Sequence, residues 1–282
     1  MSLVATSMQL RRRRIMKLPL TFLAGCAILL VSLFFGLFPQ LVAPFDPNAF
    51  DYNALLAPPS AEHLMGTDSF GRDMLSRVVD AYGLNLQIAV FATLPAIIIG
   101  VLVGALVGYA GGISEVIFGR VVDAVITFPF MVLVIAIVAV LGPGLGNMYI
   151  AVGAVNWVFY ARLVAAEVKV QKRLDYADAG RVMGYHPLRI VFRHLLPNSI
   201  TPAIVYWMTD MALAILLGSS LGYLGLGAQP PASEWGVLIA DGKNFMDTAW
   251  WISVFPGIAI VVTGLGFSLL GDGLAELLRT RK

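Results

Sequence analysis

Six long apolar stretches constrain this chain of 282 residues more than any other feature. They cover approximately residues 18–42, 85–109, 119–141, 147–166, 200–226 and 249–271. A helix needs about 20 apolar residues to cross the hydrocarbon core of a bilayer. Each stretch is long enough, although Asn156 and Tyr160 interrupt the fourth. The sequence therefore predicts an all-α, polytopic membrane protein, a helical bundle with six transmembrane helices.

Composition excludes a water-soluble globule. Hydrophobic residues make up 59% of the chain and charged residues only 13%, whereas soluble domains contain about 25% charged residues. Cys26 is the single cysteine and lies in an apolar stretch, so the sequence predicts neither a disulfide framework nor a thiolate metal site. His63 is predicted to be a turn residue rather than a metal ligand, and no metal site is expected. The net charge of +2 gives no indication of a nucleic-acid partner.

The distribution of Lys and Arg predicts the orientation. If both termini are cytoplasmic, 16 of these residues lie in cytoplasmic segments and 3 in outer ones, as the positive-inside rule requires. A cleaved signal peptide is disfavoured, because the first stretch exceeds 20 residues and no small-x-small site follows it. The predicted organisation is a cytoplasmic tail (1–17), a first transmembrane helix (18–42), an outer loop with an amphipathic helix (43–84), a transmembrane core (85–275) and a second cytoplasmic tail (276–282).

Two patterns concern the second span and the segment before it. Residues 70–82 place apolar side chains, such as Phe70 and Met74, on one helical face and charged ones on the other, which predicts an amphipathic helix lying at the outer membrane interface. Within the span, small residues recur every four positions, which predicts close packing against another helix. These residues are Gly100, Gly104 and Gly108.

Asp210 is the only acidic residue deep inside a predicted span. An unpaired carboxylate there costs about 2.5–3.5 kcal/mol or more unless it faces water, finds a partner or is protonated. Asp210 therefore either lines a translocation path or accepts a hydrogen bond from a neighbouring helix, and the second role is slightly favoured. Met208 and Met211 flank it and are expected beside it if the path runs there.

The basic segment 162–199 is the longest predicted cytoplasmic connection. It predicts two short helices, over residues 174–183 and 187–195. Gly184 suits the tight turn between them, because glycine tolerates a positive φ, and Pro187 suits the first turn of the second helix. A solvated basic loop would explain the charge of this segment, but not the spacing of its small residues, glycine and proline.

This spacing resembles the EAA loop of ABC importer permeases, with the pattern E-A-A-x3-G-x9-I-x-L-P. Asp178-Ala179-Gly180, Gly184 and Leu196-Pro197 are in register, while Asp178, Gly180 and His194 replace the commoner Glu, Ala and Ile. Three further segments resemble the dipeptide/oligopeptide/nickel branch of this family: residues 66–77 (GTDSFGRDMLSR), 222–236 (GYLGLGAQPPASEWG) and 270–274 (LGDGL). Arg120, Asp123 and Pro129 also match its R-x-x-D motif and following proline.

The resemblance implies a type I ABC importer permease fold and the second, "C"-type permease of that branch. Segment 170–199 would be the contact with a cytoplasmic ATPase, and residues 43–84 would be periplasmic. The residues implied for ATPase coupling are Asp175, Ala177, Asp178, Ala179, Gly180, Gly184, His186, Arg189, Leu196 and Pro197.

No catalytic residues are expected. The phosphate-binding pattern G-x-x-x-x-G-K-[ST] is absent from the sequence, and no nucleophile–base pair is recognisable. The resemblance implies a bacterial inner-membrane protein that is not an enzyme and binds no cofactor, with ATP and Mg²⁺ held by partner subunits. The implied partners are a homologous permease (as a heterodimer), one or two ATPase subunits, a solute-binding protein and the lipid bilayer.

The sequence does not identify the solute, and it leaves two functions other than an importer open. Dipeptides, oligopeptides, glutathione-like peptides and nickel chelates all occur in the resembling branch, with short peptides favoured. An ion-coupled secondary transporter would use Asp210 as its coupling site and would need no ATPase. A membrane scaffold would transport nothing. Co-purification of ATPase subunits would distinguish the importer from both alternatives.

Overall fold

The computed structural model describes residues 18–279, so the tail predicted at 1–17 and the last three residues of the second tail lie outside the described residues. Within that range the regular structure is helical, apart from an isolated bridge between Thr67 and Asp73, and the longest loop covers residues 42–73. Five helices are long and apolar enough to cross a membrane: α1 (Leu20–Leu37), α2 (Met74–Ala110), α5 (Leu145–Gln171), α9 (Thr201–Tyr223) and α11 (Trp251–Arg279). The prediction of an all-α membrane bundle is confirmed.

The third predicted span is not one straight helix. It forms α3 (Gly112–Thr127) and α4 (Phe130–Leu141), which are bent by 87° relative to each other, so the bundle has six spans only if this pair is counted as one. Pro129 lies at the break and has no N–H to donate, and a proline disfavours helical geometry at the residue before it. Phe128 is accordingly extended, with ψ of 139°. The uninterrupted span predicted at 119–141 was therefore wrong.

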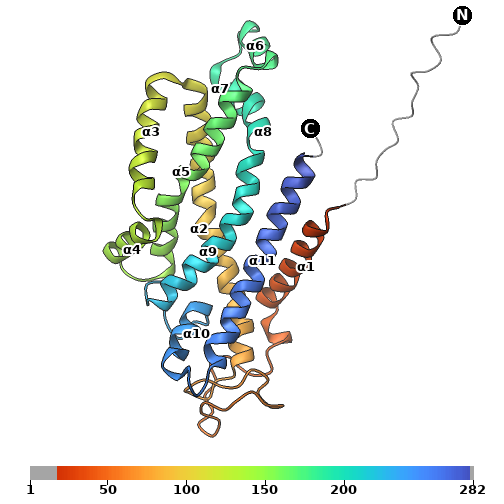
Figure 1. Cartoon of the computed structure of the whole chain (residues 1–282), viewed down its shortest axis with the longest axis vertical. Helices are drawn as coiled ribbons and strands as arrows, with labels where there is room; N and C mark the ends of the chain where they lie inside the picture. The colour runs from red at the N-terminus through yellow and green to blue at the C-terminus, as the bar shows by residue number, and fades with distance from the viewer. Residues whose placement is uncertain (1–17, 280–282) are drawn as a thin grey trace, which may run out of the picture.

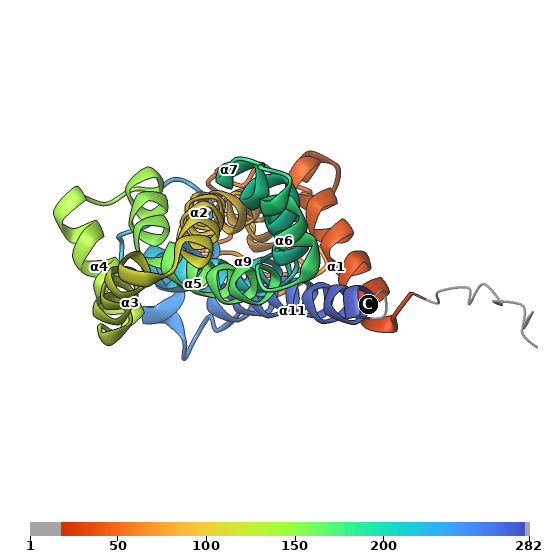
Figure 2. The same ribbon diagram turned by 90° about the horizontal axis from the view of Figure 1, so that it is seen from above.

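The helices form an elongated bundle with two distinct ends (Figure 1). α1 starts and α11 ends at the same end as the short helices α6 (Asp175–Val182), α7 (Pro187–Ile190) and α8 (Leu196–Ser199), with a π-helical turn, Val191–Leu195, between the last two. The loop 42–73 and α10 (Trp235–Gly242) lie at the opposite end. Both views place α3 and α4 at one side of the bundle and α1 at the other (Figure 2). Short 3₁₀ turns follow α1 (Pro39–Leu41) and α10 (Lys243–Phe245).

Small residues hold the helices together, as the sequence predicts for the second span. A Cβ atom added at Gly104 would lie 2.4 Å from the carbonyl oxygen of Ala161, and Gly100 and Gly108 are equally close to α5. Gly273 of α11 approaches α1 in the same way, since a Cβ atom there would lie 2.4 Å from the backbone nitrogen of Phe22. The backbones of α2 and α5, and of α1 and α11, are therefore in direct contact, as in other small-residue helix pairs in membranes.

The separate amphipathic helix predicted at 70–82 is not formed. Helix α2 begins only at Met74, where the Asp73 carboxylate accepts a hydrogen bond from the Ser76 N–H, and it continues without a break into the span. The supposed polar face is buried, with Arg77 only 1% exposed. The prediction was wrong because the loop 42–73 folds back and supplies polar partners, which a helical projection of one segment does not reveal.

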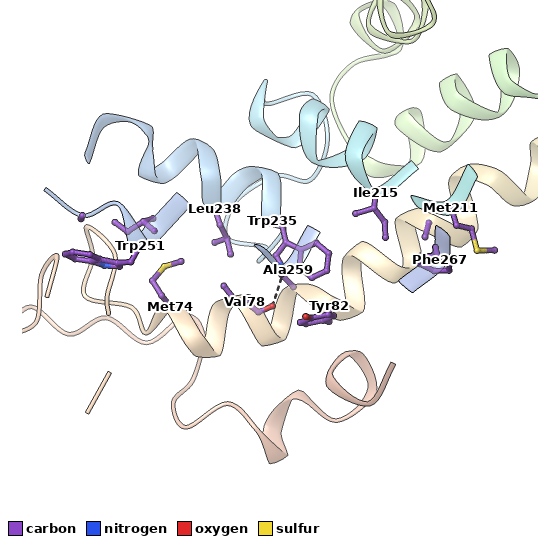
Figure 3. Packing of buried hydrophobic residues seen from close by; sticks show 14 residues of the cluster. Met74, Val78, Tyr82, Met211, Ile215, Trp235, Leu238, Trp251, Ala259 and Phe267 are labelled. Atoms are coloured by element: carbon purple, nitrogen blue, oxygen red, sulfur yellow. Dashed lines mark hydrogen bonds between the residues drawn. The ribbon is translucent and has the colours of Figure 1, made fainter. Parts of the chain in front are cut away.

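The core at this end joins α2, α9, α10 and α11 (Figure 3). Trp235 is fully buried against Tyr82, and its indole N–H donates a hydrogen bond to the carbonyl oxygen of Val78. Glu234 caps α10 by accepting hydrogen bonds from the N–H groups of Gly236 and Val237. Burial raises the pKa of the Glu234 carboxyl group, while these N–H groups and the Ser219 hydroxyl oppose that shift. The motif at 222–236 is thus a structural connection between α9 and α10.

Candidate coupling segment and membrane carboxylate

The predicted coupling segment forms a compact hairpin at the end of the bundle where α11 ends (Figure 1). Ala177 and Gly180 lie on the inner face of α6 and are buried, in contact with a cluster that contains Ile190. Gly184 has φ of +75° and makes the turn into α7, where Pro187 occupies the first position. The two predicted short helices are confirmed within one or two residues, except that Val191–Leu195 is a π-helical turn.

The remaining predicted coupling residues lie mostly on the outer surface of this hairpin. The exposed set consists of Asp175, Asp178, Ala179, Gly184, His186, Arg189 and Pro197, while Leu196 is half-buried. The structure adds two apolar residues to this surface, Val182 (89% exposed) and Met183 (60% exposed). In the sequence, Val182 and Met183 could have been recognised as an apolar pair at the end of an otherwise polar short helix. Exposed apolar side chains in such a position are typical of a protein contact surface.

Polar contacts connect α6 to the transmembrane helices. Arg181 pairs with Asp178, and its guanidinium also donates a hydrogen bond of 3.0 Å to the carbonyl oxygen of Lys172. The Lys172 ammonium in turn donates to the carbonyl oxygens of Gly108 (3.4 Å) and Tyr109 (2.9 Å), in the last turn of α2. These carbonyls have no partner inside the helix, and a cation there is favourable. Lys172 therefore connects α6 to the last turn of α2 through hydrogen bonds.

We expect Lys172→Met to loosen this connection without unfolding the protein. A cation at a helix C-terminus contributes about 0.3–1 kcal/mol, so the melting temperature should fall only slightly. If the chain works as the importer permease that its sequence resembles, solute uptake per ATP hydrolysed should fall clearly, because motion of α6 would no longer reach α2. Lys169→Met is the matched control, since the Lys169–Glu115 pair is exposed and screened by solvent. Equal uptake-to-hydrolysis ratios in both variants would contradict this role of Lys172.

Asp210 forms a hydrogen-bonded group with the two residues that interrupt the fourth apolar stretch. The Asn156 amide and the Tyr160 hydroxyl each donate a hydrogen bond of 2.6 Å to Asp210 Oδ2. Asp210 is 4% exposed and Asn156 is 3% exposed. The favoured prediction, a hydrogen bond with a neighbouring helix, is confirmed. Asn156 and Tyr160 on α5 thus supply the hydrogen-bond donors that the Asp210 carboxylate on α9 needs.

The same carboxylate also lines a cavity between α4, α5 and α9. Met208 and Met211 do not line it. Met211 is buried in the core shared with α2 and α11, and the side chain of Met208 lies 3.3 Å from the position of a Cβ atom on Gly271. The predicted role of these two methionines in a path stays a prediction, but the cavity involves other residues of α9.

The segment 66–77 forms a buried polar network at the opposite end of the bundle. Asp68 Oδ2 accepts hydrogen bonds from Arg72 Nε (2.6 Å) and from an Arg77 guanidinium nitrogen (2.7 Å). His63 Nδ1 lies 3.0 Å from Asp73 Oδ1, so His63 is a loop residue with a carboxylate partner. No group of three or more His, Cys, Asp or Glu side chains that could hold a metal ion occurs within residues 18–279. The signature at 66–77 therefore anchors the loop 42–73 to α2.

Comparison with known proteins places this architecture in a family. Residues 82–282 match the family described as binding-protein-dependent transport system inner membrane component. The chain is 39% identical over 260 residues to the probable D,D-dipeptide transport system permease protein DdpC of Escherichia coli (strain K12), covering 92% of this chain and 87% of that protein. It is 38% identical over 262 residues to the di/tripeptide transport system permease protein DppC of Pseudomonas aeruginosa (strain UCBPP-PA14), covering 91% and 86%. Identity to the glutathione transport system permease protein GsiD of Pectobacterium atrosepticum (strain SCRI 1043) is 37% over 267 residues, covering 94% and 88%.

The chain belongs to the family of inner-membrane components of binding-protein-dependent transport systems. It is a permease subunit of an ABC importer rather than an enzyme, and such a subunit works with ATPase and solute-binding partners. The resemblance seen in the sequence is confirmed, and the ion-coupled alternative is not favoured.

Proposed function

We propose that this chain forms one half of the translocation pathway of an importer for short peptides. The names of the similar permeases, which refer to D,D-dipeptides, di- and tripeptides and glutathione, support peptides as the solute class. The other half would be a homologous permease, so that the two form a heterodimer, with one or two kinds of ATPase subunit bound to the pair.

The coupling hairpin is the observation that carries the proposal. Its inner face is fixed by Ala177 and Gly180, and its outer face presents Asp178, Ala179 and Val182 beyond the ends of the long helices. An ATPase that closes on ATP would push on this outer face, and the contact through Lys172 would pass the displacement to α2. Alternating access then requires two packings of similar free energy, each favoured by different ligands.

The same placement supports the predicted orientation. The hairpin lies at the end of the bundle where α1 starts and α11 ends (Figure 1), so an ATPase bound there would put both termini in the cytoplasm. The loop 42–73 and α10 would then face the periplasm and the solute-binding protein. ATP and Mg²⁺ would be bound by the partner subunits, and this chain would hold no cofactor of its own.

The test is reconstitution of the complete transporter from this permease, its homologous partner, the ATPases and the binding protein in proteoliposomes. The binding protein is first screened against dipeptides, tripeptides, glutathione and nickel chelates by calorimetry. We expect a short peptide to bind and to be taken up only with ATP. Uptake driven by an ion gradient without ATPases would contradict the proposed mechanism, and binding of nickel chelates alone would contradict the proposed solute.

A further inference from the structure

The cavity beside Asp210 has the size and lining of a small-molecule site. Its volume is about 390 Å³, within the range of about 300–1,000 Å³ usual for such sites. Most of its lining is apolar, and three aromatic residues from three helices contribute to it: Phe130, Phe159 and Tyr206. Apolar walls keep the local dielectric constant low, so that a charge placed in the cavity interacts strongly with its surroundings.

Asp210 supplies a carboxylate to this cavity that has no cationic partner among residues 18–279. Both of its hydrogen bonds come from neutral donors and reach the same oxygen, Oδ2. None of the ion pairs within the described part of the chain includes Asp210. Amide and hydroxyl groups orient a carboxylate and lower its cost, but they do not neutralise its charge, which only a proton or a cation in the cavity would do.

The missing partner is best matched by an organic ammonium group. Such a group donates N–H hydrogen bonds to a carboxylate, and aromatic faces such as those of Phe130 and Tyr206 attract it further. A metal ion would need several anionic or imidazole ligands, whereas the described residues that line the cavity include one carboxylate and no imidazole. The free amino group of a peptide has a pKa of about 7.7–8.0 and is mostly protonated at neutral pH.

We propose that the cavity between α4, α5 and α9 binds the protonated amino group of the solute during its passage, with Asp210 as the counter-ion and Asn156 and Tyr160 as positioning residues. This inference rests on the proposed function, since it names the part of a short peptide that this permease contacts. It makes Asp210 a residue that selects for solutes with a free amine.

The first experiment measures the charge preference of the cavity without transport. Leu213 lines the cavity and is 52% exposed, and the chain has one cysteine to remove. In the assembled transporter, the variant Cys26→Ser/Leu213→Cys is treated with two methanethiosulfonate reagents of similar size, one bearing an ammonium and one a sulfonate. The variant Cys26→Ser/Leu64→Cys carries its cysteine in the loop 42–73, away from the cavity. The ratio of its reaction rates with the ammonium and the sulfonate reagent is the reference.

At Leu213→Cys we expect the ratio of the ammonium rate to the sulfonate rate to exceed the reference ratio by about tenfold or more. The reason is that the single negative charge of Asp210 acts in a low dielectric. Adding Asp210→Asn should abolish this preference, since asparagine can still accept the hydrogen bonds of Asn156 and Tyr160 but carries no charge. Asp210→Glu should restore it. An unchanged ratio in Asp210→Asn, a preference for the sulfonate, or no reaction with either reagent would overturn the proposal.

The second experiment concerns the solute and is separable from the proposed function. Uptake of a dipeptide is compared with uptake of its N-acetylated form. For each peptide, binding to the solute-binding protein is measured first, so that both peptides are delivered to the permease. Asp210→Asn should lower uptake of the free-amine peptide about tenfold and leave the acetylated peptide unchanged, with equal ATPase association in both proteins. Equal losses for both peptides would overturn the role of the amine. Absence of peptide uptake in the wild-type transporter would instead contradict the proposed function.

Discussion

Gly184→Val should reduce association of the ATPase and solute uptake tenfold or more. Gly184 forms the turn between α6 and α7 at φ of +75°, a region that costs an L-residue roughly 1–2 kcal/mol and that is a genuine outlier for a β-branched residue. Valine would force the turn into another conformation and rotate α6 away from its position on Ile190 and Tyr185. Co-purification of the ATPase and uptake into proteoliposomes measure the effect.

Gly184→Asn is the matched control for this prediction. A Cβ atom at this position would meet nothing within 4 Å, so valine and asparagine have equal room, and asparagine tolerates the left-handed conformation. We expect this variant to remain close to wild type. If both variants lost the ATPase, Gly184 would act through direct contact with the partner rather than through the geometry of its turn.

Gly180→Ala is a second informative variant on the same helix. The family pattern has alanine where this chain has Gly180, and an added Cβ atom would lie 3.7 Å from the side chains of Ile190 and Tyr185. This is ordinary van der Waals contact, so we expect ATPase association and the melting temperature to remain unchanged. A clear loss of either would show that the hairpin is packed more tightly than these distances indicate.

The parts of the fold that the sequence predicted well are those that depend on local patterns. Apolar length predicted the spans, and the four-residue spacing of Gly100, Gly104 and Gly108 predicted a packed face. Gly184 and Pro187 predicted the hairpin, because a positive φ and a helix start each need a particular residue at one position. For this reason the boundaries of α6 and α7 were predicted within one or two residues, apart from the π-helical turn that follows.

Most of the errors concern contacts between distant segments. Residues 70–82 were predicted to lie at the membrane interface, but the partners of their polar face come from the loop 42–73 and from Asp241 on α10, which lies 3.4 Å from Arg77. Asn156 and Tyr160 counted only as interruptions of an apolar stretch, since nothing local shows that Asp210, 54 and 50 positions away in the chain, is their acceptor. The bend at Pro129 was also missed, because apolar length alone does not distinguish a straight helix from a broken one.

Asp68→Asn should strongly destabilise the end of the molecule formed by the loop 42–73 and α10. Asp68 is 1% exposed and neutralises two buried arginines, Arg72 and Arg77, while its other oxygen accepts hydrogen bonds from the N–H groups of Phe70 and Arg72. An asparagine can keep the backbone contacts, but its amide group would then point hydrogen-bond donors at two guanidinium groups. Removal of one partner from a buried ion pair costs about 3–5 kcal/mol, so the melting temperature of the purified complex in detergent should fall markedly.

Two other carboxylates provide graded controls for this prediction. Asp241 contacts both arginines at 3.4–3.6 Å, but its side chain is 35% exposed, and exposed pairs contribute about 0–1 kcal/mol. Asp241→Asn should therefore lower the melting temperature only slightly. Asp80→Asn, on α2 outside this network, should leave it unchanged. A similar fall in melting temperature in all three variants would indicate that this end is generally sensitive to the loss of a negative charge. A fall confined to Asp68→Asn would show that one buried carboxylate holds the loop 42–73 on α2.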